Sequence, residues 1–454
     1  LDVSGPGRNS SSDQPTAGAV AGSAPAGSVV LGLIDVPERQ SLETLAWNPE
    51  RHSHIGCVGP RTGASAAVAL IAGQLTAAND RNTGQPCFLY LLDGDGTLEP
   101  LSSSPWVGGH VTPQKPRTAA RLLVRLQEDD GAREAAIAVL VSDWGQWVSA
   151  LRASPWPWAE DLMASLVRTS RPKLTVVLGG DRELLTAPFM PAIPNRIFLP
   201  CGASAESRLV WPRIPEIPAV PGRAALFGPM NSAASGGPAD TTHIAQLGTT
   251  CAGAAHAGSN CVTPPPLTVL DLPDFLSLAQ VRTAIRQVGS TVAEPRTIVL
   301  GLGGDGSDPI HLTVQPGTVV PILGGPGAGK STFLRAVQLL NAATDEAGAK
   351  MLCVDDAMSL DHGESLRISQ ALSAGAVVLA AIPNHLPSLS RLPLEWGLRG
   401  AEQGVVIRPH RAHDGEFFGI RLDTAGSEPA GRAVLINQGR CEWFQFPNDD
   451  GDDT

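Results

Sequence analysis

A nine-residue stretch of the chain combines the residue types that bind the phosphates of a nucleotide. It consists of Gly324, Gly325, Pro326, Gly327, Ala328, Gly329, Lys330, Ser331 and Thr332. These residues fit the pattern G-x-x-x-x-G-K-[ST] without a gap. Glycines let successive backbone N–H groups turn inward around an anion. Lys330 would then bridge the β- and γ-phosphates and Ser331 would ligate Mg²⁺, so the stretch predicts a site for ATP and Mg²⁺.

Two adjacent carboxylates supply the second part of this chemistry. Asp355 and Asp356 follow the apolar run 351–354. Asp355 would hold Mg²⁺ through water and Asp356 would position or polarise the attacking water, whereas the alternative is an edge strand with an ordinary polar end. The candidate catalytic residues are therefore Lys330, Asp355 and Asp356. Asn384, which follows the apolar run 376–382, is either a contact for the γ-phosphate or a simple turn residue.

The runs around these residues predict the elements that position them. An apolar strand over 319–323 leads into the glycines, and a helix over 332–340 follows them. A helix N-terminus at this point favours a bound anion. The chain has only four lysines among its 33 basic residues. One of them, Lys330, occupies the motif position that needs a compact ammonium rather than a planar guanidinium.

An earlier block repeats this layout with different residues. Its glycine-rich turn aligns Gly59–Ser65 with Gly325–Ser331, which places Ala64 at the lysine position. Asp143 ends an apolar run, but Trp144 follows it instead of a second acid. Without the ammonium, the charge of the β- and γ-phosphates goes largely uncompensated. This block is predicted to bind nucleotide weakly or not at all and to have a structural, regulatory or partner-binding role.

Composition shifts along the chain predict its domains. We expect a flexible tail at 1–28, a degenerate P-loop domain at 29–227, a disordered linker at 228–265, an ATPase domain at 266–447 and an acidic tail at 448–454. Strands alternate with helices in both blocks, which favours parallel sheets covered by helices. The predicted fold class is α/β, with two tandem P-loop (RecA-like) domains, mostly parallel sheets and a low-complexity linker.

Charge and cysteine content limit the function classes. The formal net charge is −11, which disfavours a protein that coats nucleic acid with a basic face but leaves a local basic channel open. Seven cysteines without a Cys-x-x-Cys pair indicate reduced thiols in the cytoplasm. No apolar run approaches 18 residues, and the first residue is not Met. We therefore expect a cytoplasmic fragment whose membrane attachment, at the inner face of the cell membrane, lies in a missing N-terminal region.

Several longer stretches resemble the FtsK/SpoIIIE superfamily, and more closely the tandem cytosolic ATPase domains of the EccC/EssC proteins of type VII secretion. They are "LGLIDVPERQSLETL" at 31–45, "LGLGGDGSDPIHLTV" at 300–314, the segment 89–111, "GVVIRPHRAHDGEFFGIRL" at 404–422 and "PAGRAVLI" at 429–436. The order of these stretches, and the pairing of one degenerate block with one intact block, carry the resemblance over 29–447.

The resemblance implies a membrane-anchored, ATP-driven motor that is often hexameric. The implied partners are helical-hairpin secretion substrates in the EccC/EssC branch, or double-stranded DNA in the FtsK branch. In an oligomer, Arg399, Arg408 or Arg432 could act on a neighbouring subunit's nucleotide, although ordinary surface arginines are the favoured interpretation.

One departure affects the expected activity. The second block is about 54 residues shorter than the first between the glycine-rich turn and the aspartate, so it lacks a counterpart of the 88–96 strand. The alternative is that 351–356 is that strand and that the aspartate-bearing strand is missing. Either case puts a full hydrolytic cycle in doubt. Three functions stay open: a type VII-like secretion ATPase, a double-stranded DNA translocase, and a nucleotide-gated regulatory scaffold with little hydrolysis.

Overall fold

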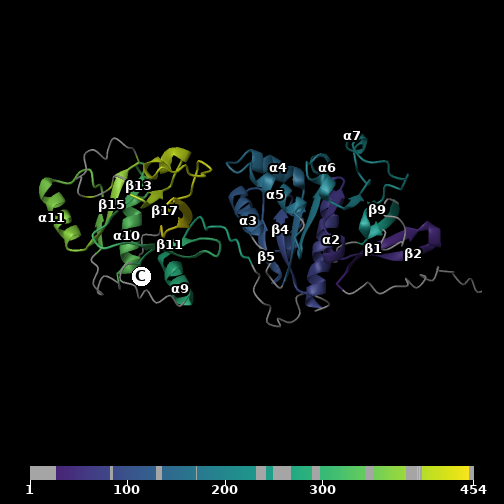
Figure 1. The fold of residues 1–454 in the computed structure, drawn as a ribbon, viewed down its shortest axis with the longest axis horizontal. Coiled ribbons are helices and arrows are strands. Elements are labelled where there is room, and N and C mark those ends of the chain that lie inside the picture. The colour runs from purple at the N-terminus through teal and green to yellow at the C-terminus, as the bar shows by residue number, and fades with distance from the viewer. Residues whose placement is uncertain are drawn as a thin grey trace, which may run out of the picture. The chain divides into compact units, whose positions relative to one another are not determined.

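The computed structural model describes residues 27–81, 85–128, 135–169, 171–231, 242–248, 267–288, 297–342, 351–384, 396, 398 and 401–448. Contacts among the described residues divide them into two compact units. The first unit is drawn from Leu1–Val107, Gly131–Gly145 and Val167–Thr263, and the second from Gly108–Asp130, Gln146–Leu166 and Pro264–Thr454. Figure 1 shows helices packed against β-strands in both parts of the chain.

The first sheet has ten strands in the order β2-β1-β10-β9-β8-β3-β7-β6-β4-β5. Strands β8, β3, β7, β6 and β4 pair in parallel, and β2, β1, β10 and β9 pair antiparallel. The strands are β1 (Val29–Val36), β2 (Ser41–Trp47), β3 (Ile55–Val58), β4 (Cys87–Asp93), β5 (Val107–Val111), β6 (Ala136–Ser142), β7 (Leu174–Gly180), β8 (Asn195–Phe198), β9 (Arg223–Phe227) and β10 (His243–Leu247).

The helices of the same stretch of sequence vary widely in length. They are α1 (Pro49–His52), α2 (Arg61–Asp80), α3 (Pro116–Glu128), α4 (Trp144–Arg152), α5 (Ala159–Arg168), α6 (Arg182–Leu185) and α7 (Ala205–Leu209). The longest, α2, follows β3 directly and buries side chains such as Val68 and Leu75 against strands of the first sheet. It therefore occupies the place that the sequence predicts for the helix after the glycine-rich turn.

The second sheet has eight strands in the order β12-β11-β18-β17-β16-β13-β15-β14. Strands β16, β13, β15 and β14 pair in parallel, and the others pair antiparallel. Its elements are α9 (Leu278–Val288), β11 (Thr297–Gly303), β12 (Asp308–Thr313), β13 (Val319–Gly324), α10 (Lys330–Asn341), β14 (Met351–Val354), α11 (His362–Ser373), β15 (Val377–Pro383), β16 (Gln403–Ile407), the 3₁₀ helix η7 (Ala412–Phe418), β17 (Arg432–Asn437) and β18 (Arg440–Gln445).

The alternation of side chains along β13 explains why helices cover both faces of this sheet. Val320 and Ile322 pack with Phe333 and Val337 of α10 in one core cluster. Val319 and Leu323 point to the opposite face and belong to a second cluster, which includes partly buried residues of α11 and η7. Successive residues of a strand face opposite sides, so a strand that is apolar throughout needs a cover on each side. The α/β fold class is confirmed.

The order of the parallel strands decides which strand of the first block corresponds to β14. In the second sheet, β15 separates the glycine-loop strand β13 from β14. In the first sheet, β7 separates β3 from β6 in the same way, and β4 lies beyond β6. Strand β14 therefore corresponds to β6, the strand that ends before Asp143. The alternative in which 351–356 replaces the 88–96 strand is wrong, and among the described residues it is the β4 position that has no counterpart in the second sheet.

Two sequence-based expectations need correction. Residues 243–247 fall inside the predicted disordered linker, yet they form β10, which pairs with β1 on one side and β9 on the other. Their burial alternates, with His243, Ala245 and Leu247 facing the core. The low-complexity composition around them hid this short period-two pattern. In addition, antiparallel strands extend the parallel strands of both sheets, so the sheets are mixed to a greater extent than expected.

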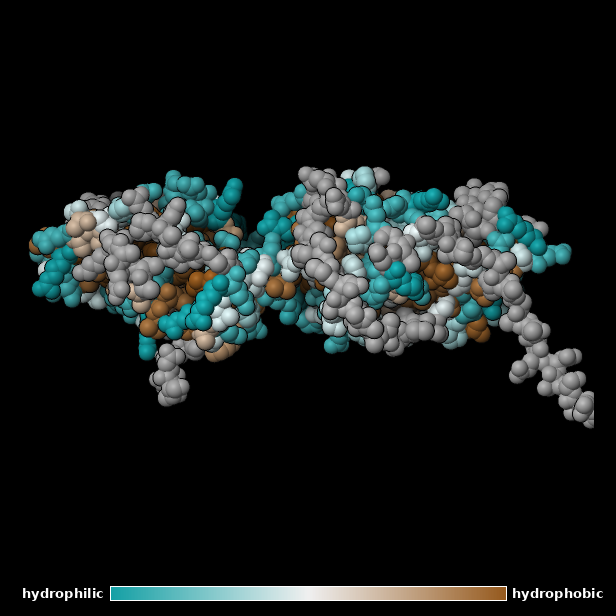
Figure 2. All heavy atoms as spheres, turned by 90° about the horizontal axis from the view of Figure 1, so that it is seen from below, coloured by the Kyte–Doolittle hydropathy of each residue, from teal (hydrophilic) through white to brown (hydrophobic). Residues whose placement is uncertain are grey.

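The surface carries both hydrophilic and apolar residues, in keeping with the near-zero mean hydropathy of the sequence. Figure 2 shows a largely hydrophilic face on which apolar areas are interspersed. Among the described residues, no helix has the length and apolar character needed to span a bilayer.

Candidate functional site

The glycine-rich loop lies between the end of β13 and the start of α10. Gly327 has φ 69° and Gly329 has φ 100°, backbone conformations that residues with a Cβ rarely adopt. Two glycines of the motif are therefore required by the backbone path itself. The twelve-residue helix α10 begins at Lys330, so the loop is followed by the free N–H groups and the positive end of a helix dipole. This is the local geometry of an anion site.

Lys330 points back into the loop that precedes it. Its Nζ donates hydrogen bonds to the carbonyl oxygens of Gly324 at 2.9 Å and Gly325 at 3.1 Å. Burial lowers the pKa of Lys330 below the ordinary value, and the negative charges of Asp355 and Asp356 oppose this shift. The two carboxylates therefore lie within electrostatic reach of the ammonium. The structure brings together the three residues that the sequence proposes as catalytic.

The parallel strands explain this convergence. Strands β13, β15 and β14 run in the same direction, so their carboxyl ends meet at one edge of the sheet. Asp355 and Asp356 follow β14 at that edge, and both are exposed. Asp356 has φ 51°, and its carbonyl oxygen accepts a hydrogen bond from the backbone N–H of Ser359 at 3.0 Å. A left-handed aspartate costs conformational energy, and such residues concentrate at functional sites.

The remaining predicted residues lie around the same loop. Ser331, on the first turn of α10, is exposed, and Thr332 next to it is partly buried. Gly324 pairs with Pro383 in the β13–β15 register, so Asn384 follows β15 at the level where the glycine loop follows β13. Carboxylates and a serine hydroxyl are oxygen donors that suit Mg²⁺, and the loop N–H groups suit phosphate. The described residues thus fit a magnesium nucleotide, with Ser331 and Asp355 as its predicted metal contacts.

The three arginines considered for action on a neighbouring subunit differ in their surroundings. Arg432 is buried, and its guanidinium donates to Gln445 and to the carbonyl oxygens of Leu272 and Pro273. It therefore ties strand β17 to the segment before α9 and is unsuited to reach another subunit. Arg408 donates from Nε to the carbonyl oxygen of Glu428 at 2.9 Å. Arg399 lies outside the described residues.

The corresponding site of the first block is built differently. Ala64, at the lysine position, has no exposed surface. Three residues earlier, Arg61 places its Nε 3.3 Å from Asp95 Oδ2 and 3.4 Å from Asp143 Oδ2. Asp143, which follows β6, has φ 44°. An aspartate with a left-handed backbone therefore follows β6 in the first block, as Asp356 does after β14 in the second. The first block keeps one aspartate, Asp143, at the position of Asp355, and Arg61 pairs with it.

Sequence reasoning missed the role of Arg61. The motif comparison scores only the lysine position, and Asp95 lies on the segment after β4, which has no counterpart in the second sheet. The signal that could have found it is the cation inside the degenerate turn together with the Asp-Gly-Asp run at 93–95.

Comparisons with solved structures identify the fold. ATPase domains 2 and 3 of EssC from Geobacillus thermodenitrificans match with a TM-score of 0.64 and 14% identity, over 93% of this chain and 96% of that chain. ATPases 2 and 3 of EccC from Thermomonospora curvata, solved with a signal sequence peptide, match with a TM-score of 0.54 and 17% identity, over 94% of both chains. The fold is that of tandem type VII secretion ATPase domains.

A longer structure extends this comparison. The cytoplasmic domain of the Thermomonospora curvata type VII secretion ATPase EccC matches with a TM-score of 0.55 and 17% identity, over 94% of this chain and 60% of that chain. No protein-family model and no curated protein matches the sequence. The expected resemblance to the EccC/EssC domains is thus confirmed at the level of the fold, for which the order of motifs was sufficient.

Proposed function

We propose that the second block binds ATP with Mg²⁺ and that the chain is an ATP-binding component of a type VII-like protein secretion motor. The observation that carries the proposal is the position of Lys330, in a glycine loop at a helix N-terminus and within electrostatic reach of Asp355 and Asp356. Backbone N–H groups, an ammonium and paired carboxylates are the groups that bind and position a magnesium nucleotide. We assign Lys330, Asp355 and Asp356 as the catalytic residues of ATP hydrolysis.

Binding of ATP by the purified chain tests the proposal directly. Wild type is expected to bind ATP in the presence of Mg²⁺, and Lys330→Ala is expected to lose most of this affinity. Gln338→Ala, an exposed substitution on the same helix, serves as the matched control. Equal binding by wild type and Lys330→Ala in titration calorimetry would overturn the assignment of the loop.

Protein export is favoured over DNA transport by charge and by fold. The net charge of −11 offers no basic surface excess for duplex DNA. One of the fold neighbours, an EccC, was solved with a signal sequence peptide. We therefore propose helical-hairpin secretion substrates as partners and a cytoplasmic location, with attachment to the inner face of the membrane through segments outside this chain. Salt-sensitive duplex binding or DNA-stimulated turnover would instead support the translocase.

The short second sheet favours slow hydrolysis. It carries β14 at its edge, where the first sheet continues with β4 and β5. Among the described residues, no strand lies on the outer side of the acidic turn at 355–356, and both aspartates are exposed. Water held by such an exposed turn is poorly oriented for attack. We propose that nucleotide binding, rather than rapid turnover, is the main role of this site.

We also propose that the chain forms a homo-oligomer, a hexamer by resemblance. Light scattering with and without ATP tests this oligomeric state.

A further inference from the structure

The glycine turn of the first block has a different backbone from the glycine loop of the second. In the second block, Gly329 is left-handed with φ 100°, and α10 begins only after it. In the first block, the aligned residue Gly63 lies inside α2, which already begins at Arg61. The N–H of Gly63 donates to the carbonyl oxygen of Pro60 at 2.8 Å. This N–H group is therefore paired within the chain and is not turned toward a ligand.

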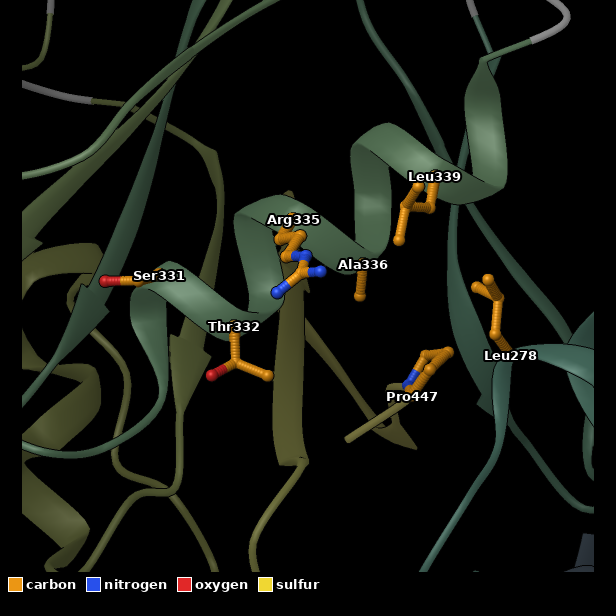
Figure 3. Close-up of a pocket in the computed structure, with 7 residues that line it drawn as sticks. All are labelled: Leu278, Ser331, Thr332, Arg335, Ala336, Leu339 and Pro447. Atoms are coloured by element: carbon orange, nitrogen blue, oxygen red, sulfur yellow. The ribbon is translucent and has the colours of Figure 1, made fainter. Parts of the chain in front are cut away.

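The two helix starts also differ in their access to solvent. Ser331, on the first turn of α10, is exposed and borders a pocket of about 190 Å³ (Figure 3). The other walls of this pocket include Leu278, Leu339 and Pro447. Ser65, which aligns with Ser331, lies on the first turns of α2 and is only 1% exposed. The second block thus leaves the start of its helix open, whereas the first block buries the corresponding hydroxyl.

The carboxylate of Asp95 lies at the start of α2. Its Oδ2 accepts from Nε of Arg61 at 3.3 Å, and Nη2 of the same guanidinium donates to the backbone oxygen of Asp95 at 3.4 Å. The Asp95 side chain is 3% exposed. Burial raises the pKa of this carboxyl, but hydrogen bonds from Ser65, Thr97 and Ser142 lower it below its ordinary value. The group that meets the first turns of α2 is therefore an anion that belongs to the chain itself.

A buried network fixes the turn that carries Asp95. Asp93 is 1% exposed and accepts from the backbone N–H of Gly96 and from the hydroxyl of Ser142, both at 2.9 Å. Gly94 approaches the end of β6 so closely that a Cβ at this position would collide with the carbonyl oxygen of Ser142. Buried polar groups that are fully hydrogen-bonded make their surroundings rigid. The carboxylate of Asp95 is therefore held beside Arg61 by a preformed turn.

We propose that Asp95 is an internal counter-ion that takes the place of a phosphate group in the first block and keeps a latent anion site at Arg61 closed. The ligand class of the opened site is a phosphate-bearing anion with its Mg²⁺. Without the carboxylate, the guanidinium of Arg61 and the hydroxyl of Ser65 face the site. Asp143, which corresponds by strand order to Asp355, remains as a contact for the metal ion. The inference concerns the first unit alone and does not depend on ATP binding by the second block.

The internal carboxylate has two advantages over a dissolved anion. A tethered group has an effective concentration on the order of millimolar even through a flexible linker, and the turn at 93–98 is fixed. In addition, the carboxylates of Asp95 and Asp143 both lie beside Arg61 and repel an incoming anion. The first block of the wild-type chain is therefore expected to bind phosphate-bearing anions at least about tenfold more weakly than a variant without the charge at position 95.

Binding of inorganic tripolyphosphate with Mg²⁺, measured by titration calorimetry, tests the proposal. Lys330→Ala serves as the background, because it weakens the site of the second block. Adding Asp95→Asn keeps the shape of the side chain, removes its charge and is expected to raise the affinity at least about tenfold. Asp35→Asn, at an exposed position in the same unit, is the matched control and should stay within about twofold. Asp95→Ser is a second variant, and circular dichroism checks the fold of each.

Arg61 provides the second arm of the test. Arg61→Ala, added to the Lys330→Ala and Asp95→Asn pair, is expected to abolish the gain, because the guanidinium is the cation of the opened site. No gain of affinity in a folded Asp95 variant refutes the proposal. A gain that persists after Arg61→Ala also refutes it, because the anion then binds elsewhere. An equal gain in Asp35→Asn refutes it as well, because the effect then reflects net charge alone.

The outcomes are separate from those for the proposed function. ATP binding by wild type and by Lys330→Ala tests the second block, whereas the change between Asp95 and its variants tests the first. If wild type binds no ATP but Asp95→Asn gains tripolyphosphate binding through Arg61, the proposed function fails and the internal counter-ion stands. If wild type binds ATP through Lys330 and Asp95→Asn gains nothing, the proposed function stands and the internal counter-ion fails.

Discussion

Arg61 Nε lies 3.4 Å from Asp143 Oδ2 in the first block, whereas Lys330 in the second block donates to the carbonyl oxygens of its own loop. Each cation is the first residue of the helix that follows a glycine-rich turn, and each turn follows a strand in the parallel part of its sheet. In the first block the cation also reaches Asp95, so two carboxylates share one guanidinium. Asp143, which corresponds by strand order to Asp355, is thus already paired within the protein.

Nucleotide stoichiometry follows from this difference. We expect one ATP per chain in titration calorimetry, and a large loss of affinity at that one site in Lys330→Ala. Ala64→Lys should not create a second site, because Ala64 has no exposed surface and a buried ammonium is costly. This variant should instead lower the free energy of unfolding by about 2–4 kcal/mol. Ala66→Lys, at an exposed position on the same helix, is the control, and two nucleotides bound to Ala64→Lys would contradict the prediction.

Loss of the Arg61 pairs should have a small effect on stability. The Arg61 side chain is 56% exposed, and exposed ion pairs contribute about 0–1 kcal/mol. Arg61→Ala is therefore expected to lower the free energy of unfolding in urea by about 1 kcal/mol at most, and the difference should shrink further at high salt. A loss of several kcal/mol would show that the pairs support the fold of this unit rather than only neutralising its acidic residues.

The two aspartates of the second block should differ in effect. Asp355→Asn is expected to weaken ATP binding mainly when Mg²⁺ is present, because it removes a metal contact. Asp356→Asn should leave binding close to wild type and reduce turnover about 100-fold or more, because it removes the group that positions water. Binding with Mg²⁺ or with EDTA, together with phosphate release, measures both effects. Asp308→Asn, at an exposed position in the same unit, is the control, and identical behaviour of the two variants would contradict the assignment.

The lowered pKa of Lys330 gives the site an alkaline limit. The ordinary lysine value is 10.5, and burial shifts the pKa of Lys330 below it, against the opposing charges of Asp355 and Asp356. The ammonium loses its proton as pH rises through the lowered pKa. ATP affinity is therefore expected to fall on the alkaline side before pH 10.5. Lys330→Arg, which stays charged, should bind more weakly but without this decline.

Asn341 anchors the end of α10 to the second sheet. Its side chain accepts from the backbone N–H of Val299 at 2.9 Å and donates to the carbonyl oxygens of Val299 at 2.9 Å and Val337 at 2.7 Å. Asn341→Ala leaves buried backbone groups without these partners and should cost about 2 kcal/mol or more of unfolding free energy. Urea denaturation measures the loss. Gln338→Ala, exposed on the same helix, should stay within about 0.5 kcal/mol.

The local chemistry of the second block follows from the sequence by itself. Gly324, Gly329, Lys330 and Ser331 lie in one short segment. The left-handed glycines and the helix that begins at Lys330 are local consequences of these residue types. The α/β class was predictable for the same reason, since apolar runs of strand length alternate with helical segments. The short strand β10 escaped because five alternating residues inside a glycine- and alanine-rich segment give a weak periodic signal.

Only the tertiary structure could decide which distant residues meet. The strand order places β14 at the position of β6, and no local pattern encodes which strand pairs with β15. In the same way, Arg61 meets Asp95 and Asp143, and Leu278 meets Leu339 and Pro447, across separations that periodicity cannot bridge. Sequence fixes local backbone and side-chain chemistry, whereas pairings between strands depend on the summed packing of the whole sheet.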